Sequence, residues 1–362
     1  MGFNCGIVGL PNVGKSTIFN AMTAAGAEAS NYPFCTIDPN VGMVPLRDVR
    51  LQNLADIVKP QRVVPNSVEF VDIAGLVKGA SSGEGLGNQF LGNIRSVDTI
   101  AHVVRCFEDR DVVHVDGRLD PLSDIETVET ELLLADLDGV TKRIEKTEKA
   151  AKKGDKKLVA ALDAAKSVKA CLEEGSPVRG LPEETREAVS DLHLISAKPV
   201  LYVANVGEDD LEGSSPGAAA VRERAESEGA GFVVISGKVE AEMAELSAEE
   251  QEEFLEGLGM KESGLTRLAL QTNKLLGLIT YFTAGEKEVR AWTVRKGALA
   301  PEAAGVIHTD FERGFIKAEV TAYEDFVSLG GEAECRKKGL TRVEGKEYVV
   351  RDGDVIYFKF AV

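Results

Sequence analysis

The motif Gly-x-x-x-x-Gly-Lys-Ser near the N-terminus constrains the fold of this chain more than any other feature. It runs from Gly9 to Ser16, between an apolar stretch at residues 3–8 and a helix-like stretch at residues 16–23. This strand–loop–helix context is typical of the phosphate-binding P-loop, where backbone N–H groups and a helix N-terminus face a phosphate. Lys15 is expected to reach the β- and γ-phosphates, and Ser16 to hold Mg²⁺. The motif predicts an α/β fold of the P-loop NTPase class.

Two further segments carry residues that suit Mg²⁺ and a γ-phosphate. Asp72 and Gly75 form Asp-x-x-Gly at the end of an apolar stretch. We expect Asp72 to hold Mg²⁺ through water and the N–H of Gly75 to contact the γ-phosphate. Thr36 lies in the loop before that strand and is expected to complete the Mg²⁺ shell, although it could also be a simple surface threonine. The predicted metal-binding residues are Ser16, Thr36 and Asp72.

The segment expected at the base differs from that of guanine-binding proteins, which carry Asn-Lys-x-Asp. This chain has Asn205-Val206-Gly207-Glu208, so the lysine is missing and the acid is one methylene longer. An Asn amide and backbone groups can pair with adenine, which favours ATP over GTP. The later loop Ser236-Gly237-Lys238 is expected to make the last base contacts. The predicted nucleotide-binding residues are Asn12, Val13, Gly14, Lys15, Ser16, Thr17, Gly75, Asn205, Val206, Glu208, Ser236 and Gly237.

Strand and helix patterns divide the chain into parts. Short apolar stretches predict the strands of a parallel sheet, with a helix at 218–228; these stretches are 3–8, 67–72, 99–105, 199–204 and 231–235. Between Pro121 and Leu172, apolar residues at three- and four-residue spacing predict two antiparallel helices, a coiled-coil hairpin. Residues 246–276 look helical and lead out of the α/β part. Strand-like stretches at 289–294, 316–322 and 355–360 then predict a small β-rich module.

We therefore expect a split α/β domain, a helical insertion and a C-terminal β-rich domain. The expected bounds are 1–120 with 199–277 for the split domain, 121–198 for the insertion and 278–362 for the C-terminal domain.

Charge and composition limit the kinds of partner that the chain is expected to bind. A formal net charge of −17 argues against nucleic-acid binding by the whole surface. The segment from Lys142 to Lys157 nevertheless holds eight basic and three acidic residues, and it is either a solvated helix face or a phosphate-contacting tip. No apolar stretch reaches membrane-spanning length, no signal peptide is evident, and the five cysteines are scattered. These features predict a reduced, cytoplasmic setting and no membrane partner.

The order and spacing of these motifs resemble one family, the Obg-like ATPases of the YchF branch. The matching segments are 9–17, 31–37, 70–76, 83–88, 205–208 and 281–285, and residues 308–316 resemble a TGS module. The resemblance implies a P-loop NTPase G domain, an inserted α-helical hairpin and a C-terminal TGS domain. It also implies ATP hydrolysis in preference to GTP, and association with the ribosome. RNA is a further candidate partner, through Lys142 to Lys157 and the TGS domain.

The group that orients the attacking water is not evident from the motifs. Leu76 stands where many related GTPases carry a water-orienting Gln, and Leu cannot hydrogen-bond to water. His114 lies in a polar loop after the strand at 99–105, whereas His102 lies inside that apolar strand. The resemblance also points to His114 as the water-positioning residue, and the alternative is a loop histidine without a role.

Asn12 completes the expected catalytic set of His114, Lys15 and Asn12. In potassium-dependent relatives an Asn at this position helps to hold K⁺ beside the phosphates, but an Asn also suits a turn; both interpretations stay open.

Two other functions compete with a nucleotide-switch ATPase. One is a true GTPase of the Obg class. The other is a ribosome- or RNA-binding module in which hydrolysis is incidental.

Overall fold

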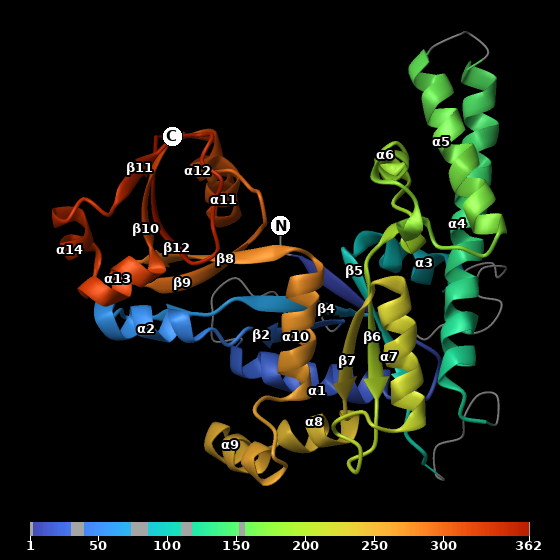
Figure 1. Cartoon of the computed structure of the whole chain (residues 1–362), viewed down its shortest axis with the longest axis horizontal. Helices are drawn as coiled ribbons and strands as arrows, with labels where there is room; N and C mark the ends of the chain where they lie inside the picture. The colour runs from blue at the N-terminus through green and yellow to red at the C-terminus, as the bar shows by residue number, and fades with distance from the viewer. Residues whose placement is uncertain (1–2, 30–39, 74–85, 110–117, 152–155, 362) are drawn as a thin grey trace.

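The computed structural model describes residues 3–29, 40–73, 86–109, 118–151 and 156–361. Figure 1 shows an α/β unit in the centre, a second sheet with the C-terminus on one side, and a long helical hairpin on the other. None of the helices within these ranges is long and apolar enough to cross a membrane.

The central sheet is built mostly from parallel strands. Among the described residues it contains six, in the order β2-β4-β1-β5-β6-β7. They are β1 (Asn4–Val8), β2 (Val41–Pro45), β4 (Ser67–Asp72), β5 (Thr99–Arg105), β6 (Val200–Asn205) and β7 (Gly231–Ile235). Only β2 runs antiparallel to its neighbour in this set. Every residue of β5 and β6 is buried, as expected for strands covered on both faces.

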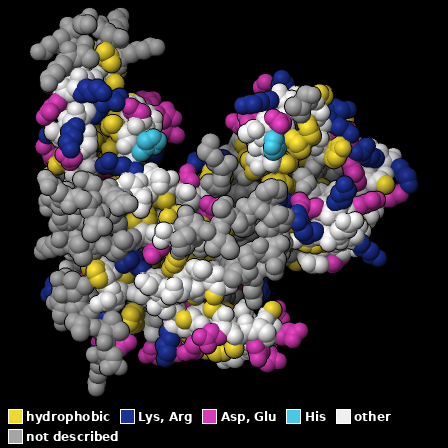
Figure 2. Space-filling view, turned by 180° about the vertical axis from the view of Figure 1, so that it is seen from behind, with side chains coloured by type: hydrophobic (Ala, Val, Ile, Leu, Met, Phe, Trp, Pro, Cys, Tyr) yellow, Lys and Arg dark blue, Asp and Glu magenta, His cyan; other side chains and the backbone are white. Residues whose placement is uncertain are grey.

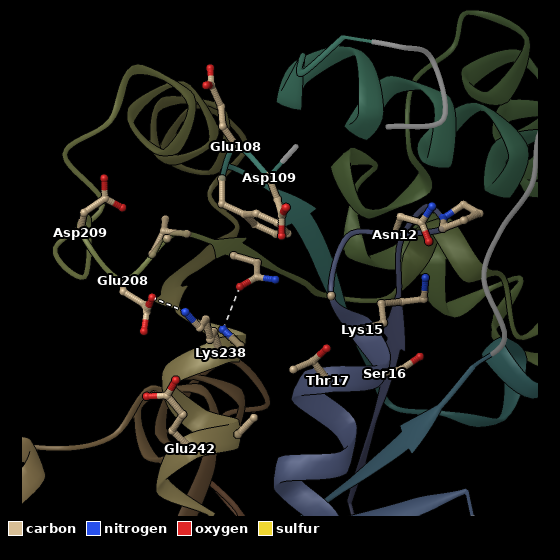
Figure 3. A pocket seen from close by; sticks show the side chains of 18 of the residues that line it. Asn12, Lys15, Ser16, Thr17, Glu108, Asp109, Glu208, Asp209, Lys238 and Glu242 are labelled. Carbon is tan, nitrogen blue, oxygen red and sulfur yellow. Dashed lines mark hydrogen bonds and ion pairs between the residues drawn. The ribbon is translucent and has the colours of Figure 1, made fainter. Parts of the chain in front are cut away.

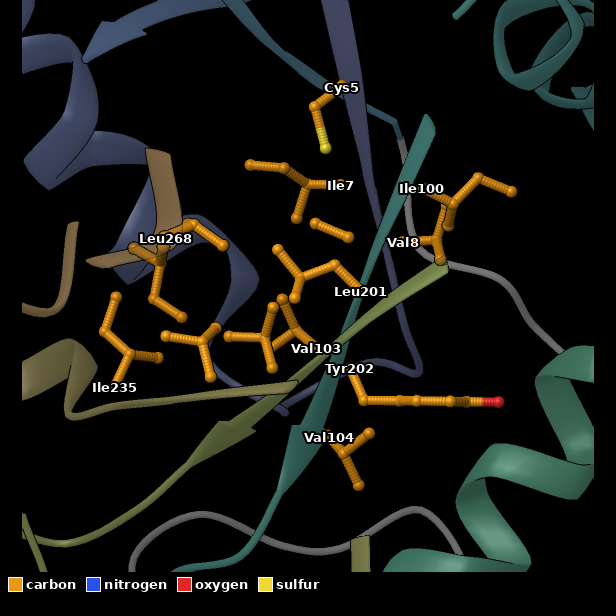
Figure 4. Close-up of a cluster of buried hydrophobic side chains, with 14 of the residues drawn as sticks. Cys5, Ile7, Val8, Ile100, Val103, Val104, Leu201, Tyr202, Ile235 and Leu268 are labelled. Atoms are coloured by element: carbon orange, nitrogen blue, oxygen red, sulfur yellow. The ribbon is translucent and has the colours of Figure 1, made fainter. Parts of the chain in front are cut away.

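Helices cover both faces of this sheet (Figure 1). One face carries α1 (Lys15–Ala29) and α10 (Gly264–Leu275); the other carries α3 (Leu86–Ser96), α4 (Pro121–Ala151) and α7 (Pro216–Glu228). In Figure 4, side chains from neighbouring strand positions point to opposite sides, so that Leu201 faces Leu268 of α10 and Tyr202 faces α4. The period-two alternation of the strands thus creates two apolar layers.

The stretch 246–276 is helical as expected, but it is broken in its middle into α9 (Ala248–Gly257) and α10. Helix α8 (Gly237–Met243) precedes it. Gly259 has a φ of 70°, which ends the helical path, and the Ser263 side chain accepts a hydrogen bond from the N–H of Thr266 at 3.0 Å. A glycine in the left-handed region followed by an N-cap serine starts a new helix.

The predicted helical hairpin is confirmed, with α5 (Lys156–Glu173) returning along α4. The two helices share a core that includes Val140 and Val168. Short helical turns then lead back to the central sheet: η2 (Val178–Gly180), α6 (Glu183–Glu187), η3 (Ser190–Leu192) and η4 (Ile195–Ala197). Arg179 joins the hairpin to the central unit, because its Nη2 lies 2.8 Å from carboxylates of both Glu129 on α4 and Glu228 on α7.

The second sheet has the order β11-β10-β12-β8-β9-β3 among the described residues. Its C-terminal strands are β8 (Leu278–Ala284), β9 (Val289–Arg295), β10 (Phe315–Ala322), β11 (Arg342–Glu344) and β12 (Asp354–Phe360). The associated helices are α11 (Ala300–Ile307), α12 (Thr309–Arg313), α13 (Tyr323–Leu329) and α14 (Glu332–Lys337). One core packs against α11 and α12, and another packs against α13.

A segment from the N-terminal part of the chain completes this second sheet. Helix α2 (Val49–Val58) buries Leu54 against Phe282 and Phe326, and β3 (Val63–Val64) pairs with β9. Both elements lie between β2 and β4 in sequence, so the segment leaves the central sheet, enters the C-terminal core and returns. The two sheets are therefore connected by the covalent chain and by the core that α2 shares with the C-terminal part. Strand β4, to which the chain returns, ends at Asp72.

Candidate functional site

A pocket lies at the carboxyl ends of the parallel strands. Its volume is about 1190 Å³, and it is lined by Asp72 at the end of β4 and by residues that follow β1, β5, β6 and β7. Ligands of open parallel sheets bind at this edge, because the loops after neighbouring strands converge there. Figure 3 shows Lys15, Ser16 and Asn12 at one end of the pocket and Glu208 with Lys238 at the other.

The P-loop has backbone angles that require its glycines. Gly9 and Gly14 have φ values of 152° and 92°, and a Cβ on Gly9 would lie 2.4 Å from the carbonyl oxygen of Val103. A Cβ on Gly14 would lie 2.2 Å from Nδ2 of Asn205. Asn12 also has a positive φ, 63°, a region that Asn tolerates better than most residues. The loop is therefore packed closely against β5 and β6 before any ligand binds.

Lys15 is held at the phosphate end of the pocket. Its Nζ donates to the carbonyl oxygens of Gly9 at 2.8 Å and Leu10 at 2.7 Å, and the residue is only 8% exposed. Burial lowers the pKa of Lys15 to about 8, against the opposing effect of the Asp72 charge. Burial likewise raises the pKa of Asp72, and Lys15 opposes that shift. The two groups therefore sense each other's charge across the pocket.

Asn205 ties the P-loop to the loop after β7. Its Nδ2 donates to the carbonyl oxygen of Val13 at 2.8 Å, and its Oδ1 accepts from the N–H of Gly237 at 2.9 Å. The residue is buried, with 3% exposed. Each end of the amide binds one backbone group and keeps one further N–H or lone pair. Pairing of this amide with the base stays a prediction. Asn205 shapes the pocket through the two loops that it joins.

An ion pair stands at the end of the pocket away from the P-loop. Oε2 of Glu208 lies 2.6 Å from Nζ of Lys238, and both side chains are largely exposed (Figure 3). This hydrogen bond raises the pKa of Lys238. The sequence has no lysine directly after Asn205, and the cation that engages the carboxylate is Lys238, the second residue of α8.

An aromatic side chain forms another part of the wall. Phe107 follows β5 and lines the pocket, and the Arg105 guanidinium carbon lies 4.6 Å from the centre of its ring. Arg105 is buried and donates from Nε to the carbonyl oxygen of Phe107 at 3.2 Å and from Nη2 to that of Asp109 at 3.3 Å. These bonds fix the turn that carries the ring, so Phe107 offers a positioned apolar surface.

The pocket as a whole is acidic. Among its described lining residues, two lysines, Lys15 and Lys238, face seven carboxylates: Asp72, Glu108, Asp109, Glu208, Asp209, Glu242 and Glu245. A bare triphosphate would be repelled by this set, so an anionic ligand would enter more favourably with a bound cation.

Comparisons with known proteins agree with this geometry. A model described as "50S ribosome-binding GTPase" matches residues 4–128, and the YchF-GTPase_C model, described as "Protein of unknown function (DUF933)", matches 278–361. The chain is 56% identical to the Ribosome-binding ATPase YchF of Haemophilus influenzae and 55% identical to that of Bacillus subtilis, with 100% of each chain covered. The chain belongs to the YchF family.

A solved structure of the same family supports the fold. The Schizosaccharomyces pombe YchF GTPase matches with a TM-score of 0.88 and 38% identity, over 99% of this chain and 98% of that chain. The α/β P-loop unit, the helical insertion and the C-terminal β-rich part predicted from the sequence are confirmed by this match.

Most of the predicted site residues meet at this pocket. The residues that line it are Asn12, Gly14, Lys15, Ser16, Thr17, Asp72, Asn205, Val206, Glu208 and Gly237. Val13 and Ser236 are buried and are not among the lining residues. The Ser236 hydroxyl has no hydrogen-bond partner within the described part of the chain. Thr36, Gly75, Leu76 and His114 lie outside the described residues.

Sequence reasoning missed Phe107 and Asp109, and it placed Lys238 in a base-contacting loop without predicting its ion pair with Glu208. Each follows a strand whose carboxyl end reaches the pocket, and this position is the signal that could have identified them.

Proposed function

We propose that this chain is a Mg²⁺-dependent ATPase that associates with the ribosome and binds ATP more tightly than GTP. The observation that carries the proposal is the preformed P-loop with a buried Lys15 opposite Asp72, in a chain 54–56% identical over its full length to proteins named Ribosome-binding ATPase YchF. The solved S. pombe relative is named a GTPase, so the preference for ATP in this chain depends on the residues at the base end of the pocket.

The phosphate end suits a Mg²⁺–triphosphate complex. Ser16 is exposed at the start of α1 and, like Asp72, lines the pocket, so both can supply oxygen ligands or hold water around a hard cation. Within the described residues no group of three His, Cys, Asp or Glu side chains is arranged to hold a metal alone. This fits Mg²⁺, which keeps several waters and binds with the phosphates. We propose Ser16, Asp72 and Thr36 as its protein ligands, and Mg²⁺ would neutralise charge on the β- and γ-phosphates.

Lys15 would change partners when a nucleotide binds. In the structure its ammonium group is held by two P-loop carbonyl groups. A bound phosphate offers a charged acceptor in place of these neutral ones, and charge-assisted hydrogen bonds are the stronger kind. Lys15 is therefore already near its working position.

The base end favours adenine on physical grounds. A guanine reader uses a free carboxylate that accepts from two donors on one edge of the base. Here Glu208 is one methylene longer than Asp and already shares Oε2 with Lys238. The Glu208–Lys238 ion pair presents to the base one acceptor beside one cationic donor. To bind guanine with both oxygens, the Glu208 carboxylate would first have to leave Lys238. The Phe107 ring supplies a stacking surface for either base.

His114 is proposed to position the attacking water, since Leu76 cannot. K⁺ is proposed as an additional cation near Asn12, although the positive φ of Asn12 gives this residue a conformational reason of its own. Comparing hydrolysis in K⁺ and Na⁺ separates these two roles for Asn12.

The function is tested with wild type and Lys15→Ala. Wild type should hydrolyse ATP only with Mg²⁺ and should sediment with ribosomes in a manner that depends on nucleotide. Lys15→Ala should lose hydrolysis while its circular dichroism spectrum stays native. Hydrolysis by the variant would refute the role of the P-loop, and ribosome binding that ignores nucleotide in wild type would favour the module with incidental hydrolysis.

A further inference from the structure

Glu240 is a buried carboxylate to which the proposed function gives no role. The acidic side chains of the neighbouring helix α9 are exposed, and Figure 2 shows magenta side chains gathered along the lower edge of the molecule, where Figure 1 places α9. Glu240 lies on α8 and is only 3% exposed. A glutamate is seldom buried to this extent unless it is paired. The burial of Glu240 therefore points to partners that stabilise its charge within the protein.

The partners of Glu240 lie at the start of α10. Its Oε1 accepts from the N–H of Gly264 at 2.7 Å, and the N–H of Leu265 also donates to the carboxylate. The first N–H groups of a helix have no partner within the helix, and a negative charge is favoured beside them. Burial raises the pKa of Glu240, whereas these hydrogen bonds and the charge of Arg267 oppose the increase. Glu240 thus anchors α8 to the N-terminus of α10.

The start of α10 is itself held against β7. A Cβ on Gly264 would lie 2.7 Å from Cγ1 of Ile235 and 2.9 Å from Oε1 of Glu240, so a side chain at this position would push α10 away from both. Ile235 ends β7 and directly precedes Ser236, whose carbonyl oxygen accepts from the N–H of Glu240 at 3.0 Å. The end of β7, the first turn of α8 and the start of α10 therefore form a closed set of contacts.

The first turn of α8 also forms one wall of the nucleotide pocket. Gly237 and Lys238 line the pocket, whereas Glu240 is not among its described lining residues. The N–H of Gly237 donates to Oδ1 of Asn205, and Lys238 forms the ion pair with Glu208 (Figure 3). A shift of α8 would therefore move the groups at the base end of the pocket.

We propose that Glu240 is a positioning residue for the base end of the pocket. By holding α8 against α10, it keeps Gly237 and Lys238 where they meet the base and the ribose. The phosphate end is held separately, because the P-loop packs against β5 and β6, and carbonyl groups of that loop bind Lys15. Loss of the Glu240 contact therefore weakens binding of the nucleoside part and leaves binding of the phosphates unchanged. The proposal rests on the nucleotide binding proposed above for this pocket.

The test compares ATP with inorganic tripolyphosphate, which has the phosphates but neither base nor ribose. Both are titrated as Mg²⁺ complexes into the full-length chain by calorimetry. Glu240→Ala should weaken ATP binding at least about fivefold, the lower end of the effect of losing one polar contact, and should leave tripolyphosphate affinity unchanged. Glu240→Gln keeps one acceptor oxygen and should have a smaller effect. In steady-state hydrolysis, the KM for ATP should rise in Glu240→Ala while kcat changes little.

Glu249→Gln is the matched control, because it makes the same chemical change as Glu240→Gln at an exposed position of α9 and should bind both ligands like wild type. Equal losses of ATP and tripolyphosphate affinity, or wild-type ATP affinity in Glu240→Ala, would overturn the proposal. If Glu240→Ala does not fold, Glu240→Gln and Gly264→Ala decide, since Gly264→Ala displaces α10 from the same carboxylate. A selective loss of ATP affinity in these variants supports the proposal, and an unchanged ratio of the two affinities overturns it.

Wild type distinguishes this inference from the proposed function. If wild type binds ATP no more tightly than tripolyphosphate, both proposals fail, because the base end then contributes nothing. If wild type prefers ATP and the Glu240 variants keep that preference in full, only this inference fails and the proposed function stands.

Discussion

Replacing Asn205 by alanine should destabilise the protein before any nucleotide is added. The Asn205 amide makes two buried hydrogen bonds, to Val13 and Gly237, and its loss leaves a carbonyl and an N–H group without that partner. Each such buried group typically costs about 1–3 kcal/mol, so the free energy of unfolding should fall by about 2–6 kcal/mol. Affinity for ATP and for GTP should fall together, because the loops that shape both ends of the pocket separate.

The assay is urea denaturation of the nucleotide-free protein, followed by calorimetric titration with ATP and with GTP. Glu208→Gln is the matched control, since this exposed residue lines the same pocket and should leave the unfolding midpoint unchanged. If Asn205→Ala unfolds like wild type but loses ATP binding selectively, then Asn205 reads the base and the assignment of a linking role is wrong.

Other consequences of the structure are equally measurable. Burial lowers the pKa of Lys15 to about 8, and the protonated form of Lys15 binds phosphate. ATP affinity measured by calorimetry should therefore be greatest below pH 8 and should fall by up to about tenfold per pH unit above it. An ATP affinity that stays constant up to pH 10 would contradict this prediction. His114→Ala should cut single-turnover hydrolysis by roughly 10²–10⁴ with little change in ATP affinity, whereas Leu76→Ala should have a small effect; wild-type turnover in His114→Ala would assign the water to another group. Leu54→Ala should lower the free energy of unfolding by about 2–5 kcal/mol. It should also speed hydrogen exchange in the C-terminal core, since Leu54 packs there although it belongs to the N-terminal part of the chain. Faster exchange in α2 alone would refute the shared core.

The local pattern of the chain predicts five of the six strands described in the central sheet, and β2 was not predicted. β4, β5 and β7 have the predicted bounds, and β1 and β6 differ from prediction by one residue, because each is a short apolar stretch ended by turn-forming residues. The break between α9 and α10 was missed, since apolar spacing continues across Gly259 and hides the N-cap at Ser263.

Long-range packing is what the pattern could not predict. Leu54 packs against Phe282 and Phe326, more than two hundred residues away, so nothing local reveals that α2 joins the C-terminal core. The P-loop motif identifies Lys15 because its chemistry depends on neighbours in sequence. The roles of Asn205 and Lys238 depend on loops that meet only after the sheet has formed.

Competition between ATP and GTP for the wild-type pocket in the presence of Mg²⁺ measures the nucleotide preference of this chain. We predict that ATP binds at least several-fold more tightly, since the loss of a paired base contact typically costs roughly 1–3 kcal/mol. Equal or tighter binding of GTP would contradict the account and would make this chain a GTPase with an unusual base loop.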